Sequence, residues 1–153
     1  IGGRVLTQTD AATSQPLDGE MNQRVLLHRQ RRPDDWGLIE EPLALAAVLR
    51  AEAAEGRCLL VDCLTLWLTN LLMLDDDQRL AEERDALLAC LEQLPGTLIL
   101  VSNETGLGVV PMGELTRRYV DLAGWLHQAV AERCQRVVLT VAGLPLILKG
   151  PAL

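Results

Sequence analysis

Basic and nucleophilic side chains gather in one short stretch of the sequence, from Asp18 to Trp36. His28 stands there among four arginines, at positions 24, 29, 31 and 32. Guanidinium groups bind phosphate oxygens through paired hydrogen bonds. A neutral imidazole can attack the α-phosphorus of a nucleotide while the arginines offset the developing charge. The stretch therefore indicates a phosphate- and nucleotide-handling site. The alternative is a solvated basic helix end with a surface histidine.

A helix is expected to carry this histidine. Asp18 is a suitable N-cap, and the helical pattern continues through the arginines until Pro33 ends it. Met21, Val25 and His28 share one face of that helix. His28 then lies at its C-terminal end, beside the basic side chains.

A carboxylate closes the apolar run Arg57–Cys63. Asp62, in LLVDC, resembles in its position the acidic residue that holds Mg²⁺ in phosphate-loop NTPases. An aspartate that caps the following helix is the alternative interpretation.

Polar side chains also follow the apolar run Thr97–Ser102. The segment Ser102–Pro111 (SNETGLGVVP) offers the amide of Asn103 and the carboxylate of Glu104 in a loop shaped by two glycines and a proline. Spacing alone favours a structural turn for this loop over a binding site.

The elements that must position these groups alternate between strands and helices. The strands are expected at Arg57–Cys63, Thr97–Ser102 and Arg136–Val141, and the helices at Pro42–Glu55, Leu64–Leu74, Arg79–Leu94 and Gly113–Arg133. The strand runs are continuously apolar, as in parallel strands covered on both faces. The pattern predicts a single α/β domain over residues 1–153 with a largely parallel sheet, whose ligands bind beyond the carboxyl ends of the strands.

Composition narrows the possible partners. A formal net charge of −7 argues against a general nucleic-acid or membrane surface. The longest apolar stretch is interrupted by polar residues, so we expect no membrane span. Four cysteines without C-x-x-C spacing are expected to be free thiols in a reducing cytoplasm.

Several motifs together resemble the bifunctional adenosylcobinamide kinase/adenosylcobinamide-phosphate guanylyltransferase family of cobalamin biosynthesis. The matching pieces are ATSQPLDGEM, RVLLHRQRRPDDW, IEEP, LLVDCLTLWLTNLL, VSNETGLGVVP and the terminal VVLTVAGLPLILK. They stand in the family's order and spacing from Ala12 onward.

The resemblance implies a P-loop NTPase-like three-layer α/β domain with a mostly parallel sheet. It implies phosphorylation of adenosylcobinamide, then transfer of GMP from GTP to that phosphate through a GMP–histidine intermediate on His28. Mg²⁺ would accompany GTP or ATP, and Asp62, which stands where the family has Glu, would help hold it. Homo-oligomers, commonly trimers, are also implied. The nucleotide contacts of the family fall on Thr13, Ser14, Gln15, Arg29, Gln30, Arg31, Arg32, Glu40 and Asp62.

One departure from the family concerns the phosphate loop. The family opens with a strand and a G-G-x-R-S-G-K-S loop whose backbone N–H groups and lysine cradle the phosphates. Here Ile1-Gly2-Gly3-Arg4 leads directly into VLTQTDA, and the only lysine is Lys149. The loop is therefore missing from the chain, and we expect the natural protein to contain it in residues outside this sequence. A protein without it should lack kinase activity and transfer GMP poorly.

Two other functions fit parts of the pattern. One is a P-loop small-molecule kinase in which His28 is incidental, which predicts phosphate transfer without a covalent nucleotide on the protein. The other is a nucleotide-binding or oligomerisation module without catalysis, which predicts binding without turnover.

Overall fold

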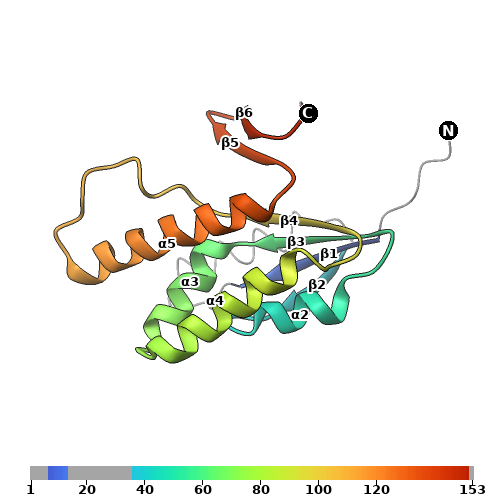
Figure 1. Cartoon of the computed structure of the whole chain (residues 1–153), viewed down its shortest axis with the longest axis horizontal. Helices are drawn as coiled ribbons and strands as arrows, with labels where there is room; N and C mark the ends of the chain where they lie inside the picture. Colours follow the sequence, from blue (N-terminus) through green and yellow to red (C-terminus); the bar gives the residue numbers. More distant parts are fainter. Residues whose placement is uncertain (1–6, 14–35, 152–153) are drawn as a thin grey trace.

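The computed structural model describes residues 7–13 and 36–151. Four strands form one parallel sheet in the order β2-β1-β3-β4 (Figure 1). Their bounds are β1 Thr7–Ala12, β2 Gly37–Glu40, β3 Arg57–Asp62 and β4 Thr97–Val101. The helices are α2 Leu45–Glu52, α3 Leu64–Met73, α4 Asp77–Leu91 and α5 Glu114–Arg133. The predicted α/β class with a mostly parallel sheet is confirmed.

Alternate strand residues build the core. Ala11, Leu59 and Val61 point to one face of the sheet, where they join a single apolar cluster with residues of all four helices. On the opposite face of β4, Ile99 is 47% and Val101 is 39% exposed. Within the described residues, the helices therefore cover the face that carries Val61. Figure 1 shows α2 and α4 together on one side of the sheet.

Local side chains fix where two of the helices begin. Asp76 is the N-cap of α4 and accepts a hydrogen bond from the backbone N–H of Arg79 at 2.9 Å. Ahead of α2, the carboxylate of Glu41 accepts hydrogen bonds from the N–H groups of Leu43 and Ala44. These bonds satisfy N–H groups that have no partner within the helix.

The most apolar helix is the one that follows Asp62. Helix α3 buries Trp67 completely, and the indole Nε1–H donates to the carbonyl oxygen of Leu43 at 2.8 Å. This bond satisfies the polar end of a buried indole, as burial requires. Trp67 therefore links α3 to the segment that leads into α2.

The last two strands stand apart from the parallel sheet. Strand β5, Val137–Val141, pairs antiparallel with β6, Leu144–Lys149, in a separate two-stranded sheet. Ala142 and Gly143 both have positive φ, which suits a tight hairpin turn. The prediction of a covered parallel strand at Arg136–Val141 is therefore wrong in its pairing, although the strand exists. A continuous apolar run specifies a strand but not its partner.

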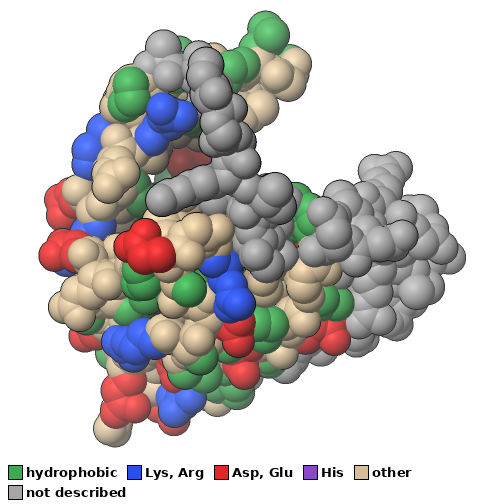
Figure 2. All heavy atoms as spheres, turned by 90° about the vertical axis from the view of Figure 1, so that its right-hand side faces the viewer, with side chains coloured by type: hydrophobic (Ala, Val, Ile, Leu, Met, Phe, Trp, Pro, Cys, Tyr) green, Lys and Arg blue, Asp and Glu red, His purple; other side chains and the backbone are tan. Residues whose placement is uncertain are grey.

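The other expected elements are found within a few residues of their predicted bounds. The strands predicted at Arg57–Cys63 and Thr97–Ser102 and all four predicted helices are present. The helix expected from Asp18 lies outside the described residues. No helix among the described residues is long and apolar enough to cross a membrane. Acidic and basic side chains are interspersed on the face seen in Figure 2.

Candidate functional site

One row of residues crosses the parallel sheet at its carboxyl end. The register pairs Glu40 of β2 with Ala12 of β1, Ala12 with Asp62 of β3, and Asp62 with Val101 of β4. Neighbouring strands lie about 4.8 Å apart, so the backbones of Glu40 and Asp62, on either side of β1, lie about 10 Å apart across the sheet. Paired residues of one row point to the same face. The two predicted acidic contacts therefore share one edge and one face of the sheet.

Thr13 ties the ends of β1 and β3 together. Its hydroxyl donates to the carbonyl oxygen of Cys63 at 2.7 Å and accepts from the Cys63 N–H at 3.0 Å. The side chain of Asn70, in α3, donates to the carbonyl oxygens of Thr13 at 2.7 Å and of Pro42 at 3.1 Å. Thr13 is 1% exposed. Its hydroxyl thus holds the backbone beside Asp62, and a direct contact with nucleotide stays a prediction.

Asp62 occupies the position expected of a metal-binding carboxylate. It is the last residue of β3, it is partly buried, and a cis peptide bond joins it to Cys63. The N-cap of α3 is Cys63 rather than Asp62, and the Cys63 side chain makes no capping hydrogen bond. The structure therefore does not support the alternative that Asp62 caps α3.

The loop after β4 is held against α3. Both the backbone N–H and the side-chain amide of Asn103 donate to the hydroxyl of Thr65, at 2.9 and 3.0 Å. The Glu104 carboxylate accepts from the N–H of Gly106 within the same loop. Further along, the guanidinium of Arg117 donates to the carbonyl oxygens of Pro111 and Met112. These contacts anchor the loop at both ends.

A second histidine lies at this edge, and sequence reasoning missed it. Nε2 of His127, in α5, lies 2.7 Å from the hydroxyl oxygen of Ser102, and Nδ1 lies 3.9 Å from a carboxylate oxygen of Glu104. His127 is 25 residues from Ser102 in the chain, and its local sequence carries no motif. The only available signal was that a helix following β4 returns past the end of that strand.

Many of the predicted site residues fall outside the described part of the chain. They are Ser14, Gln15, His28, Arg29, Gln30, Arg31 and Arg32. Thr13, Glu40 and Asp62 are described, and all three lie at the carboxyl edge of the sheet. The predicted meeting of that edge with His28 stays a prediction.

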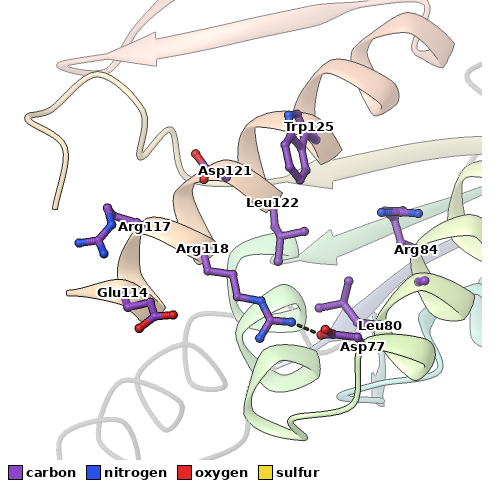
Figure 3. Close-up of a pocket in the computed structure, with 10 residues that line it drawn as sticks. Asp77, Leu80, Arg84, Glu114, Arg117, Arg118, Asp121, Leu122 and Trp125 are labelled. Carbon is purple, nitrogen blue, oxygen red and sulfur yellow. Dashed lines mark hydrogen bonds and ion pairs between the residues drawn. The ribbon is translucent and has the colours of Figure 1, made fainter. Parts of the chain in front are cut away.

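One hollow among the described residues lies between α4 and α5. It has a volume of about 500 Å³, and Figure 3 shows Leu80, Leu122 and Trp125 around it with an ion pair between Arg118 and Asp77. None of the residues that line it is among the predicted site residues.

A smaller hollow of about 280 Å³ lies between α3 and α5. Thr65, the residue that anchors Asn103, lines it together with Tyr119. Burial raises the pKa of the Tyr119 phenol, so this wall presents a neutral hydroxyl.

Comparison with known proteins identifies a family. Residues 7–148 match the family described as cobinamide kinase / cobinamide phosphate guanyltransferase. A Pseudomonas aeruginosa protein described as bifunctional adenosylcobalamin biosynthesis protein CobP is 72% identical over 142 residues, which are 93% of this chain and 82% of the relative. The Escherichia coli protein described as bifunctional adenosylcobalamin biosynthesis protein CobU is 34% identical over 151 residues, with 90% of this chain and 83% of the relative covered. Its Salmonella typhimurium counterpart is 33% identical with the same coverage.

Proposed function

The chain belongs to the cobinamide kinase / cobinamide phosphate guanyltransferase family, and we propose that its reactions take place at the carboxyl edge of its parallel sheet. The protein is a bifunctional enzyme of cobalamin biosynthesis that phosphorylates adenosylcobinamide and transfers GMP from GTP to the product. The observation that supports this location is the shared row of Glu40 and Asp62 at the carboxyl ends of the two parallel strands that flank β1. Ligands of open α/β sheets bind beyond such ends.

We propose that GMP transfer proceeds by double displacement through His28. An imidazole nitrogen attacks the α-phosphorus of GTP, so that an N–P bond forms and the bond to pyrophosphate breaks. A phosphate oxygen of adenosylcobinamide phosphate then attacks the same phosphorus, and the N–P bond breaks. Arg29, Arg31 and Arg32 orient the phosphates and offset charge in both steps. Ser14, Gln15 and Gln30 are proposed to contact the nucleotide.

Mg²⁺ bound to the nucleotide fits the residues at this edge. Within the described residues, no group of three or more acidic, histidine or cysteine side chains is arranged to hold a metal by itself. Mg²⁺ is commonly held by one or two carboxylates together with substrate phosphates and water. Asp62 is proposed to supply the carboxylate, and Glu40 to bind the sugar or base. When bound, the metal neutralises phosphate charge.

The phosphate cradle of the family is proposed to lie in a part of the natural protein outside these 153 residues. The single lysine of the chain does not serve as the phosphate-loop lysine here, because Lys149 Nζ donates to the carbonyl oxygens of Ala131 and Glu132, at 2.8 and 2.9 Å. The aligned stretch covers 82% of the Pseudomonas relative, so that protein has further residues. An intact mass of the natural protein equal to that of these 153 residues would refute this proposal.

We also propose that the protein is cytoplasmic and that it forms a homo-oligomer. All four cysteines are free, which fits a reducing cytoplasm. Val141, Leu144, Leu146 and Leu148 of the β5–β6 hairpin are more than half exposed. Such apolar exposure is typical of a surface that contacts another protein, and we propose a homo-oligomer, with a trimer as the first stoichiometry to test.

Labelled GTP tests the covalent step. The protein is incubated with Mg²⁺ and GTP labelled in either the α- or the γ-phosphate, and protein-bound label is measured before and after acid. We expect acid-labile label from α-labelled GTP alone, and its release by adenosylcobinamide phosphate. Label from the γ-position alone would favour a phosphorylated enzyme and contradict the proposal, as would product formation with no bound label.

A further inference from the structure

We infer that Ser102 and His127 form a proton relay that accepts the proton of the hydroxyl group phosphorylated in the kinase reaction. This inference rests on the proposed function at the carboxyl edge of the sheet. Ser102 is the first residue after β4, one position beyond Val101, which pairs with Asp62. Its hydroxyl therefore lies near the edge at which the phosphate donor is proposed to bind.

The contacts of the two His127 ring nitrogens set the direction of proton transfer. The 2.7 Å separation between the Ser102 hydroxyl oxygen and His127 Nε2 is a short hydrogen bond. On the other side of the ring, Nδ1 faces the Glu104 carboxylate at 3.9 Å. A carboxylate on that side favours a proton on Nδ1, which leaves Nε2 to accept from Ser102. The His127 and Glu104 side chains are 25% and 38% exposed, so their attraction is modest and serves mainly to orient the ring.

No other charged group competes for the His127 ring among the described residues that pack against α5. Helix α3 and strand β4 contain no ionisable Asp, Glu, Lys or Arg side chain. The charged groups that meet α5 from α4, from its C-cap Glu92 and from β6 bond elsewhere: Asp77 with Arg118, Arg84 with Asp85, Glu92 with Arg133, and Lys149 with backbone carbonyls at the end of α5. Glu104 is thus the charged neighbour that acts on His127.

The contacts favour a relay over a covalent serine. An acyl- or phosphoryl-serine needs N–H donors aimed at the reacting oxygen. The N–H that follows Ser102 is that of Asn103, and it is bonded to Thr65; the N–H of Gly106 is bonded to Glu104. The nearest loop donors are therefore already engaged.

The relay removes the proton of the substrate hydroxyl while the phosphoryl group is transferred. The substrate oxygen forms a bond to the γ-phosphorus while the bond from that phosphorus to the nucleoside diphosphate breaks. The substrate proton passes to the Ser102 oxygen, and the serine proton passes to Nε2 of His127. The resulting imidazolium faces Glu104. His127 does not touch the substrate. It positions the Ser102 hydroxyl and accepts the proton that the serine releases.

The ring tautomer gives a test that does not depend on turnover. Long-range ¹H–¹⁵N correlation spectra of the ¹⁵N-labelled protein, assigned with a His28→Gln variant, report which nitrogen of neutral His127 carries the proton. We expect the proton on Nδ1 and a shift of the Nε2 signal in Ser102→Ala. A proton on Nε2 would overturn the relay, because the histidine would then donate to the serine.

Kinetics on the full-length protein provide the second test. His127→Gln is expected to lower kcat for adenosylcobinamide phosphorylation about 100-fold with little change in KM, as for loss of a general base. Ser102→Ala should cost a similar factor, and the double variant no more than either single one. Gln128→Ala, which alters the neighbouring exposed residue of α5, is the matched control and should match the wild type.

The variants also distinguish a relay from a purely structural histidine. The pH profile of kcat should differ between the wild type and His127→Gln, because only the wild type has a base that can accept the serine proton. His127→Gln places an amide group near the position of Nε2, so that variant can still hydrogen-bond Ser102 but provides no base. Wild-type activity in His127→Gln, or the same pH profile in that variant as in the wild type, would overturn the relay. A wild type that makes no cobinamide phosphate would overturn the kinase half of the proposed function and the relay with it. A wild type that makes this product while Nε2 carries the proton would overturn the relay alone.

Discussion

Thr13 and Cys63 are 50 residues apart in the chain, yet two hydrogen bonds through one hydroxyl join them. The Thr13 hydroxyl donates to the Cys63 carbonyl and accepts from its N–H, and both residues are buried. This pair fixes the end of β1 against the end of β3, next to Asp62. The position of the acidic row therefore depends on a polar contact in the interior.

Replacing Thr13 with valine should destabilise the protein by about 3 kcal/mol. Valine keeps the shape of the side chain but leaves the carbonyl and N–H of Cys63 buried without their partner, each at a cost of about 1–3 kcal/mol. Urea unfolding followed by circular dichroism measures the effect. Thr13→Ser, which retains the hydroxyl, should recover most of the loss, and a valine variant as stable as the wild type would contradict this account.

Asp62→Asn should raise the Mg²⁺ concentration needed for half-maximal guanylylation by at least about tenfold, since even groups one step removed from a metal cost 10–100-fold in affinity. The fold should persist because the amide has nearly the same shape. Labelling by α-labelled GTP across an Mg²⁺ titration provides the measurement. Glu55→Gln is the control, because Glu55 is exposed beyond the opposite end of β3. Equal Mg²⁺ dependence in both variants would exclude Asp62 as a metal ligand.

Two tryptophans offer a matched comparison of core and surface. Trp67 is fully buried, whereas Trp125 is 63% exposed. Trp67→Ala should cost about 3–5 kcal/mol of unfolding free energy through lost packing and a cavity. Trp125→Ala should change stability by less than about 0.5 kcal/mol. Similar losses in the two variants, measured by thermal and urea unfolding, would mean that the core is not centred on α3.

The buried thiols should make the protein less stable at alkaline pH. Burial is the main cause that raises the pKa of Cys58, Cys90 and Cys134 above that of a free thiol. The folded state therefore holds these protons more tightly than the unfolded chain. Their contribution is fully present below the ordinary thiol pKa of about 8.5 and is lost as pH rises through the raised values. The urea concentration at the midpoint of unfolding should accordingly decrease as the pH is raised from 7 to 10.

Thiol reactivity checks the same shifts independently. At pH 8 a disulfide reagent should react slowly with the native protein and rapidly with all four cysteines in urea. Cys134, the least buried of them, should react first in the native state. Reaction of native Cys90 at the rate of a free thiol would contradict the assigned burial.

The sequence predicted those parts of the fold that local patterns encode. Continuous apolar runs identified β3 and β4, and helical periodicity identified α2 to α5. Asp62 was singled out because a carboxylate that closes an apolar strand resembles the Mg²⁺-binding acid of phosphate-loop NTPases, and that role stays a prediction. Strand β2, with Gly37 and Glu40 at its ends, was missed because four residues carry too little pattern.

Two features depend on contacts that no local pattern encodes. The partner of β5 is set by the turn at Ala142 and Gly143, since the apolar run by itself fits either a parallel or an antiparallel neighbour. The contact of Ser102 with His127 is created by the return of α5 past the end of β4, and the register of that return is a tertiary property. His127 therefore could not be distinguished from a surface histidine in the sequence.

Mass spectrometric mapping of the guanylylated protein shows whether His28 carries GMP. The protein is reacted with Mg²⁺ and GTP, digested at alkaline pH to preserve the N–P bond, and searched for GMP-bearing peptides. We predict one modified peptide with GMP on His28, and no modification in His28→Ala. GMP on another residue, or on the His28→Ala protein at wild-type level, would contradict the account.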